Sequence, residues 1–200
     1  MTGIFGGSFD PVHNGHLAVA IGALLQHEAD EVWFMVSPEN PLKQGHLHAS
    51  EADRLQMARL AVDSISEPEL IGKIIVSDFE FSLPRPSYTI DTLRALSEAF
   101  AGKRFKWIVG SDNLVNFSQW RSPEEILESY GIIVYPRPGY PLSTDVPESV
   151  RILTNVPSFK ESSTSIRSAL RQGADAYSLP LPRGVRDYIA ARENLYGVSI

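Results

Sequence analysis

The N-terminal stretch constrains the fold of this chain more than any other part of the sequence. Residues 3–16 read GIFGGSFDPVHNGH, which predicts a buried strand over residues 2–7, a glycine-rich turn, and a helix from Gly15 to about His27. Backbone N–H groups at the start of a helix have no partner within it, and the helix dipole adds to their attraction for anions. Gly6 and Gly7 lack a Cβ, which lets the main chain approach a ligand closely. The stretch therefore predicts a phosphate-binding site.

Two histidines flank the predicted start of this helix. His13 and His16 can each donate a hydrogen bond to a phosphate oxygen, and the charged form of an imidazole also offsets anionic charge. The alternative is that the pair only caps the helix. Two histidines without a third ligand nearby make a poor zinc site, so we predict no metal site built by the protein.

Strand-like and helical patterns alternate along the rest of the chain. The strand-like runs lie at residues 31–36, 74–76, 105–109, 132–135 and 150–153. The helical patterns begin near residues 51, 89, 123, 162 and 185. This alternation predicts an open, mostly parallel, doubly wound α/β sheet of Rossmann-like type. No linker or repeat divides the chain, so we expect a single domain over residues 1–200, with a small helical portion at about 160–200.

Composition narrows the class of protein. The formal net charge of −6 argues against a general nucleic-acid surface, so any phosphate site must be locally positive. The absence of cysteine excludes disulfides and a cysteine nucleophile. No export signal is visible at the N-terminus, and the apolar run 17–25 is far shorter than the roughly 20 residues that span a bilayer. We expect a cytoplasmic protein with neither nucleic acid nor membrane as a partner.

Several polar segments follow predicted strands and are expected at one edge of the sheet, where ligands bind in such folds. They are the loop 38–43, Gly110–Asp112 and Pro136–Arg137. Asp112 can bond a ribose hydroxyl or cap the next turn. Asp10 fits either an Asx-turn or a ligand contact.

A second anion site is predicted near the C-terminus. Residues 162–167 read SSTSIR, and hydroxyl side chains at a helix start either cap the helix or donate to phosphate. Arg167, one turn further on, adds a planar and permanently charged fork. Alone, the segment fits an ordinary capped helix with a surface arginine. Together with the first motif, it predicts a second helix end facing the same anion.

The glycine turn lacks both the Gly-x-Gly-x-x-Gly fingerprint and a Walker loop, but it resembles a third signature. Residues 6–16 are similar to the motif of the nucleotidylyltransferase superfamily, whose His-x-Gly-His element holds the phosphates of a nucleoside triphosphate. Within it, nearly the whole chain resembles the bacterial nicotinate-nucleotide adenylyltransferase family. The matching motifs are NPLK at 40–43, PSYTIDTL at 86–93, GSD at 110–112, Trp120, PRPGY at 136–140, SSTSIR at 162–167 and LY at 195–196. Ser8 and Glu161 depart from the family pattern, which usually has threonine and an apolar residue there; Glu161 bears on how the helix at 162–167 is entered.

The resemblance implies transfer of AMP from ATP to nicotinic acid mononucleotide, which yields deamido-NAD and pyrophosphate in NAD biosynthesis, with Mg²⁺ accompanying ATP. The implied ATP-binding residues are Gly6, Gly7, Ser8, Phe9, His13, His16, Gly110, Asp112, Arg137, Ser163, Thr164 and Arg167. The implied mononucleotide-binding residues are Lys43, Tyr88, Thr89, Asp112, Trp120 and Arg121. Trp120 is the candidate for stacking on the pyridine ring, whereas Trp33 and Trp107 lie in strands and are expected in the core.

The implied catalytic residues are His16, His13, Lys43 and Arg167. His16 is expected at the α-phosphate and His13 at the triphosphate. Lys43 and Arg167, with the hydroxyls of Ser163 and Thr164, are expected at the β- and γ-phosphates, although a solvated loop lysine is the alternative for Lys43. Other readings are another mononucleotide or phosphopantetheine adenylyltransferase, or a non-catalytic nucleotide-binding sensor domain. The sequence allows a homo-oligomer.

Overall fold

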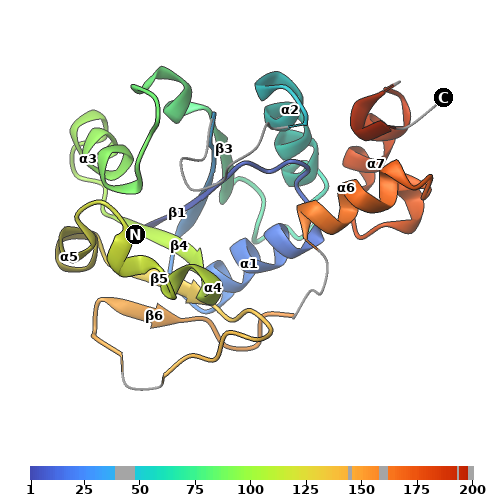
Figure 1. Ribbon diagram of the computed structural model, residues 1–200. Helices are drawn as coiled ribbons and strands as arrows, with labels where there is room; N and C mark the ends of the chain where they lie inside the picture. Colours follow the sequence, from blue (N-terminus) through green and yellow to red (C-terminus); the bar gives the residue numbers. More distant parts are fainter. Residues whose placement is uncertain (39–47, 144–145, 158–161, 193, 198–200) are drawn as a thin grey trace.

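A computed structural model describes residues 1–38, 48–143, 146–157, 162–192 and 194–197. Within these residues, six strands form one sheet in the order β3-β2-β1-β4-β5-β6, and every neighbouring pair is parallel (Figure 1). The strands are β1 (Thr2–Gly7), β2 (Glu31–Val36), β3 (Ile74–Ser77), β4 (Phe105–Gly110), β5 (Ile132–Tyr135) and β6 (Val150–Ile152). The open parallel sheet predicted from the sequence is confirmed.

The helices connect these strands and complete the C-terminal part. They are α1 (Asn14–Leu25), α2 (Glu51–Val62), α3 (Thr89–Ala99), α4 (Ser111–Leu114), α5 (Pro123–Glu125), α6 (Ser163–Arg171) and α7 (Arg183–Ala190). Short 3₁₀ turns lie at Phe79–Ser82, Phe117–Gln119, Ala176–Ser178 and Leu195–Gly197, and a π-helical turn at Ile126–Tyr130. Helix α4 occupies a position where the sequence predicts only a turn. None of the helices in the described ranges is long and apolar enough to cross a bilayer.

Alternating strand residues build a core on each face of the sheet, as expected when both faces are covered by helices. On one face, Phe5 and Phe34 belong to a buried cluster with residues of α1, α2, α6 and α7. On the other face, Ile4 and Trp107 belong to a cluster with residues of α3. Trp33 is also buried there, so the prediction that Trp33 and Trp107 lie in the core is confirmed.

The strand order reverses between β1 and β4, which pair through Thr2 with Phe105 and Ile4 with Trp107. From this pair, the chain adds strands outward in both directions. The carboxyl ends of β1 and β4 therefore diverge into different connections, and a crevice between them is the usual ligand site of such sheets.

The buried face of α2 differs from the stripe that the sequence suggests. The helical spacing of Leu55, Ala58, Val62 and Ile65 predicts an apolar face, but Leu55, Val62 and Ile65 are only partly buried against the core, and Ile65 lies beyond the end of α2. The fully buried face carries Arg54, Met57, Ala58 and Ala61. Because the buried face includes a charged residue, it is displaced by one residue from the face that the apolar residues predict. The spacing of apolar residues alone does not reveal this displacement.

Candidate active site

Two adjoining cavities open at the carboxyl ends of the central strands. The larger has a volume of about 610 Å³ and the smaller about 170 Å³. Five residues line both: Phe5, Gly6, Gly7, Asn113 and Tyr135. The glycine turn that the sequence singles out thus forms the boundary between two compartments, which suits a site that brings two molecules together.

The start of α1 faces the larger cavity, with both histidines on its wall. His13 is the N-cap residue, and its Nδ1 accepts a hydrogen bond from the Gly15 N–H at 3.1 Å. Nδ1 of His16 accepts from the His13 N–H at 3.1 Å, and the two rings lie 3.8 Å apart between centroids. An imidazole whose Nδ1 accepts carries its proton on Nε2 when it is neutral. The capping alternative and the ligand-binding prediction are therefore compatible, because capping uses Nδ1 and fixes Nε2–H as a donor.

His13 is held in its neutral form. The residue is buried, and burial followed by the positive charge of Arg137 lowers the pKa of His13 to about 4. At neutral pH, His13 therefore offers a hydrogen bond rather than a positive charge. Positive charge in the larger cavity comes from Arg137 and Arg167, which both line it.

Gly6 is required by packing inside the protein. A Cβ at Gly6 would lie 2.2 Å from Cζ2 of Trp107, so the indole fills the space that the missing side chain leaves. A Cβ at Gly7 would meet Phe9 at an ordinary 3.4 Å. The sequence predicts that a ligand approaches the main chain closely at both glycines. At Gly6, the group that lies this close is the Trp107 indole. Ser8 and Phe9 line the larger cavity, and Phe9, at φ 47°, stacks on Phe34.

Asp10 ties three distant segments together, a role that neither alternative from the sequence anticipates. Its carboxylate accepts from the backbone N–H groups of His48 at 2.9 Å and Ala49 at 3.2 Å. It also accepts from the hydroxyl of Tyr196 at 2.6 Å. The Asp10 carbonyl accepts from Nη1 of Arg167 at 2.6 Å. Asp10 thus joins the glycine turn to the start of α2, to α6 and to the C-terminal turn.

Arg54 on α2 holds the glycine turn through hydrogen bonds to backbone carbonyls. Its Nη1 donates to the carbonyls of Ser8 and Ser37, each at 2.7 Å, and its Nη2 to the carbonyl of Pro38 at 3.3 Å. The side chain is fully buried, so these charge-assisted bonds are shielded from water. Arg54 fixes the segments that follow β1 and β2. The sequence did contain a signal for this burial. Arg54 lies at helical spacing with Met57, Ala58 and Ala61, and so on the same face of the helix.

The start of α6 reaches the larger cavity, as the sequence predicts. Ser162 caps the helix by accepting from the Ser165 N–H. Ser163 donates its hydroxyl to the carbonyl of Pro11 at 2.9 Å, and Nη2 of Arg167 donates to the Thr164 hydroxyl at 3.2 Å. Ser163, Thr164 and Arg167 all line the cavity, as the start of α1 does. The two helix starts are joined through Pro11 and Asp10 and face one volume.

The remaining wall of the larger cavity follows β4 and β5. Asp112 and Arg137 line it, with Nε of Arg137 3.6 Å from Oδ1 of Asp112. Ser111 accepts from the Arg137 N–H at 2.9 Å, which links the ends of the two strands. Gly110, expected with ATP, lines the smaller cavity instead. Burial raises the pKa of Tyr135, on the shared wall, to about 12, so it stays a neutral phenol.

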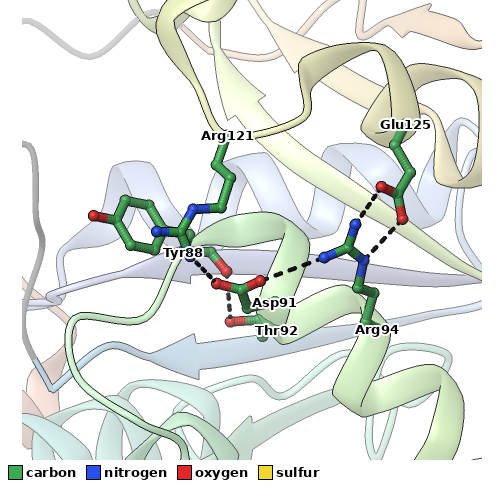
Figure 2. Close-up of polar contacts among 6 residues, drawn as sticks. All are labelled: Tyr88, Asp91, Thr92, Arg94, Arg121 and Glu125. Carbon is green, nitrogen blue, oxygen red and sulfur yellow. Dashed lines mark hydrogen bonds and ion pairs between the residues drawn. The ribbon is translucent and has the colours of Figure 1, made fainter.

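The smaller cavity collects four of the six residues predicted to bind the mononucleotide; Asp112 lines the larger cavity, and Lys43 lies outside the described residues. Tyr88, Thr89, Trp120 and Arg121 all line it. Trp120 is half-buried and its ring lies 5.2 Å from that of Phe117. The Arg121 guanidinium lies over the Tyr88 ring and donates to Asp91 (Figure 2). The pocket therefore offers two aromatic surfaces and a guanidinium.

A buried carboxylate that the sequence reasoning missed, Glu80, lines this pocket. Glu80 accepts from the hydroxyls of Thr92 at 2.8 Å and Ser87 at 3.4 Å. Burial raises its pKa, and these hydrogen bonds oppose that rise. Its partners come from the PSYTIDTL segment, whose serine and threonines were the available signal. Lys43, Asn40 and Glu161 lie outside the described residues, so the structure does not place them.

Comparisons with known proteins agree with this arrangement. The family model described as cytidylyltransferase-like matches residues 4–169. A protein of Bacteroides thetaiotaomicron named "probable nicotinate-nucleotide adenylyltransferase" is 44% identical over 94% of this chain and 92% of its own length. One of the same name from Flavobacterium johnsoniae is 37% identical over 94% of each chain.

A solved structure has the same fold. The Plasmodium falciparum nicotinic acid mononucleotide adenylyltransferase complexed with NaAD superposes with a TM-score of 0.77, covering 98% of this chain and 96% of that one. At 20% identity, this likeness concerns the fold alone. Because the sequence relatives match almost end to end, the chain belongs to the nicotinate-nucleotide adenylyltransferase family of cytidylyltransferase-like proteins.

Proposed function

We propose that the protein transfers AMP from ATP to nicotinic acid mononucleotide, releasing deamido-NAD and pyrophosphate as a step of NAD biosynthesis. The observation that supports this most directly is the pair of adjoining cavities. One is lined by two helix starts, three histidines and two arginines, and the other by residues that include Tyr88 and Trp120. A triphosphate suits the first cavity and a planar pyridine ring suits the second.

The reaction needs no protein nucleophile. A phosphate oxygen of the mononucleotide is already anionic and attacks the α-phosphorus of ATP. The new O–P bond forms as the bond between the α-phosphorus and the bridging oxygen breaks, and the electron pair leaves with pyrophosphate. The protein's work is therefore positioning and stabilisation of charge on the phosphoryl oxygens.

Within this proposal, the donors of the larger cavity divide the phosphates between them. His16 serves the α-phosphate in the transition state, and neutral His13 donates to the triphosphate. Arg167 serves the β- and γ-phosphates with the Thr164 hydroxyl, and with the Ser163 hydroxyl once its single proton turns from the Pro11 carbonyl to the phosphate. An arginine has five N–H donors, so Arg167 can bind phosphate while keeping its bonds to Asp10 and Thr164. Lys43 stays a prediction from the sequence for the same phosphates.

Magnesium enters, in this proposal, as part of the ATP substrate. Across the described ranges, no group of three or more histidine or carboxylate side chains is arranged to hold a metal ion. Mg²⁺ usually keeps several waters and is held by substrate phosphates with one or two carboxylates. Asp112, beside Arg137 on the wall of the larger cavity, offers one such carboxylate. A cytoplasmic location and a homo-oligomer stay predictions.

The test is release of pyrophosphate from ATP in the presence of Mg²⁺. We expect release that requires nicotinic acid mononucleotide and does not occur with phosphopantetheine. Release with phosphopantetheine alone would favour that class of adenylyltransferase, and binding of ATP without release under any condition would favour a sensor domain. Parallel assays with nicotinamide mononucleotide measure the preference between acid and amide.

A further inference from the structure

We propose that Asp91 is a positioning residue for the mononucleotide pocket, and that it acts by holding Arg121 against Tyr88. This inference rests on the proposed function, because it concerns the second substrate of that reaction. Asp91 lies in the first turn of α3 and is not among the residues that line the smaller cavity in the described chain. Any effect of Asp91 on the substrate must therefore pass through a residue that does line it.

The first link in this arrangement joins Arg121 to Asp91 and to the Tyr88 ring. Nη1 of Arg121 donates to Oδ2 of Asp91 at 2.7 Å, and Cζ of Arg121 lies 3.7 Å from the centroid of the Tyr88 ring. Figure 2 shows the guanidinium between the ring and the carboxylate. A guanidinium stacked on an aromatic face and paired at its edge keeps one orientation. The turn that carries Trp120 and Arg121 is thereby fastened to α3.

The second link fixes Asp91 itself. Nη1 of Arg94 lies 3.6 Å from Oδ1 of Asp91. Arg94 also donates through Nε and Nη2 to the two carboxylate oxygens of Glu125, at 2.9 and 2.5 Å. The charges alternate along this chain from the Trp120 turn through α3 to α5 (Figure 2). An isolated exposed pair contributes little, but a network with a bidentate arginine holds its members in place.

The main chain of Tyr88 is held by buried contacts that do not involve Asp91. Its carbonyl accepts from the N–H of Thr92 at 3.0 Å and from the hydroxyl at 3.3 Å. That hydroxyl also bonds the buried carboxylate of Glu80. Loss of Asp91 therefore leaves the backbone of the pocket in place. What it releases is the Arg121 guanidinium and, with it, the Trp120 turn.

Release of these groups has a specific kinetic consequence. Without Asp91, the guanidinium samples other rotamers, and the substrate must order it again on binding. The mononucleotide then binds more weakly, while the α-phosphate chemistry in the larger cavity is unchanged. Loss of a pair of about 1 kcal/mol corresponds to roughly a fivefold rise in KM at constant kcat.

The experiment compares Asp91→Asn, Arg121→Ala, the double variant and the control Glu124→Gln in steady-state assays with both substrates. Glu124 is an exposed acid beside Glu125, so its neutralisation matches the charge change. We expect Asp91→Asn to raise the KM for nicotinic acid mononucleotide about fivefold, with kcat and the KM for ATP within about twofold of wild type. The double variant should match Arg121→Ala, and Glu124→Gln should match wild type.

An unchanged mononucleotide KM in Asp91→Asn would overturn the inference. So would a double variant whose KM rises by the product of the two single effects, because Asp91 would then act independently of Arg121. Should Asp91→Asn fail to fold, Arg94→Gln carries the test, with a smaller rise in the same KM expected. A wild-type protein inactive with this mononucleotide would refute the proposed function, whereas an active wild type with an unaffected variant would refute this inference alone.

Discussion

The imidazole rings of His13 and His16 lie with their centroids 3.8 Å apart and their planes inclined at 32°. Each ring uses Nδ1 to accept a backbone N–H of the same helix start. This exchange is a capping box built from two histidines, and it sets both Nε2 atoms as donors at neutral pH. The two residues thus cap the helix together, and this capping prepares both for one chemical task, which is donation to phosphate.

Replacing His16 tests the chemical task. We expect His16→Ala to lower kcat by about 10²–10³-fold, the usual loss when a donor to a developing anion is removed. His27→Asn, which removes an imidazole two residues beyond the C-terminal end of the same helix, should keep wild-type turnover. Steady-state kinetics and circular dichroism of both variants make the measurement. Near-normal turnover in a folded His16→Ala protein would exclude the assignment.

His13 makes stability depend on pH. Its pKa falls from 6.5 in the unfolded chain to about 4 in the native protein, so between these values the unfolded chain binds a proton that the native protein does not. Stability therefore falls as pH drops through this window, by about 3 kcal/mol in total. Urea unfolding of wild type and His13→Asn isolates this contribution from other groups. The stability difference between the two proteins should shrink from pH 7 to pH 4, and a constant difference would show that folding does not lower the pKa of His13.

Gly6 and Gly7 should respond differently to the same substitution. In Gly6→Ala, the new Cβ would overlap the Trp107 indole at 2.2 Å, and we expect a loss of about 2 kcal/mol or more from overpacking. In Gly7→Ala, the nearest atom lies at 3.4 Å on Phe9, so the loss should stay below about 1 kcal/mol. Denaturant unfolding compares the two. Equal stabilities would show that Trp107 moves aside readily.

Arg54 should be essential to the shape of the glycine turn. Arg54→Met leaves the carbonyls of Ser8, Ser37 and Pro38 without their donor, at a cost of about 3 kcal/mol or more. Because Ser8 lies on the wall of the larger cavity, the KM for ATP should also rise. Arg59→Met, an exposed position on the same helix, is the control and should change neither quantity. Denaturant unfolding measures the loss of stability, and steady-state kinetics measure the KM for ATP. Unchanged values of both in Arg54→Met would contradict this role of Arg54.

Local patterns were sufficient for most of the fold. Alternation of apolar runs with helical spacing predicted β1 to β6 and the longer helices, because each depends on residues close in sequence. Helix α4 was not predicted, since four residues after a strand give little periodic signal. The strand order was also not predicted, because it is set by contacts between distant segments such as Thr2 and Phe105.

The candidate site divides in the same way. The polar side chains that line the cavities stood out through the glycine turn and the PSYTIDTL and SSTSIR segments. The residues that hold them did not. Arg54 and Glu80 act from buried positions on partners at least seven residues away in sequence, and each looks like an ordinary helix or turn residue in its local context. Tyr196 stood out only as part of the LY motif, which did not indicate its bond to Asp10. The ring of Tyr88 likewise gains its partner Arg121 only through tertiary folding.

In the proposed reaction, AMP passes directly from ATP to the mononucleotide across the shared wall of the two cavities. The most direct measurement follows the label of ATP marked at its α-phosphate, with nicotinic acid mononucleotide and Mg²⁺ present. We predict that the label appears in the dinucleotide in equal amount to the pyrophosphate released, with none on the protein. Label bound covalently to the chain, or pyrophosphate released without labelled dinucleotide, would refute direct transfer between the two substrates.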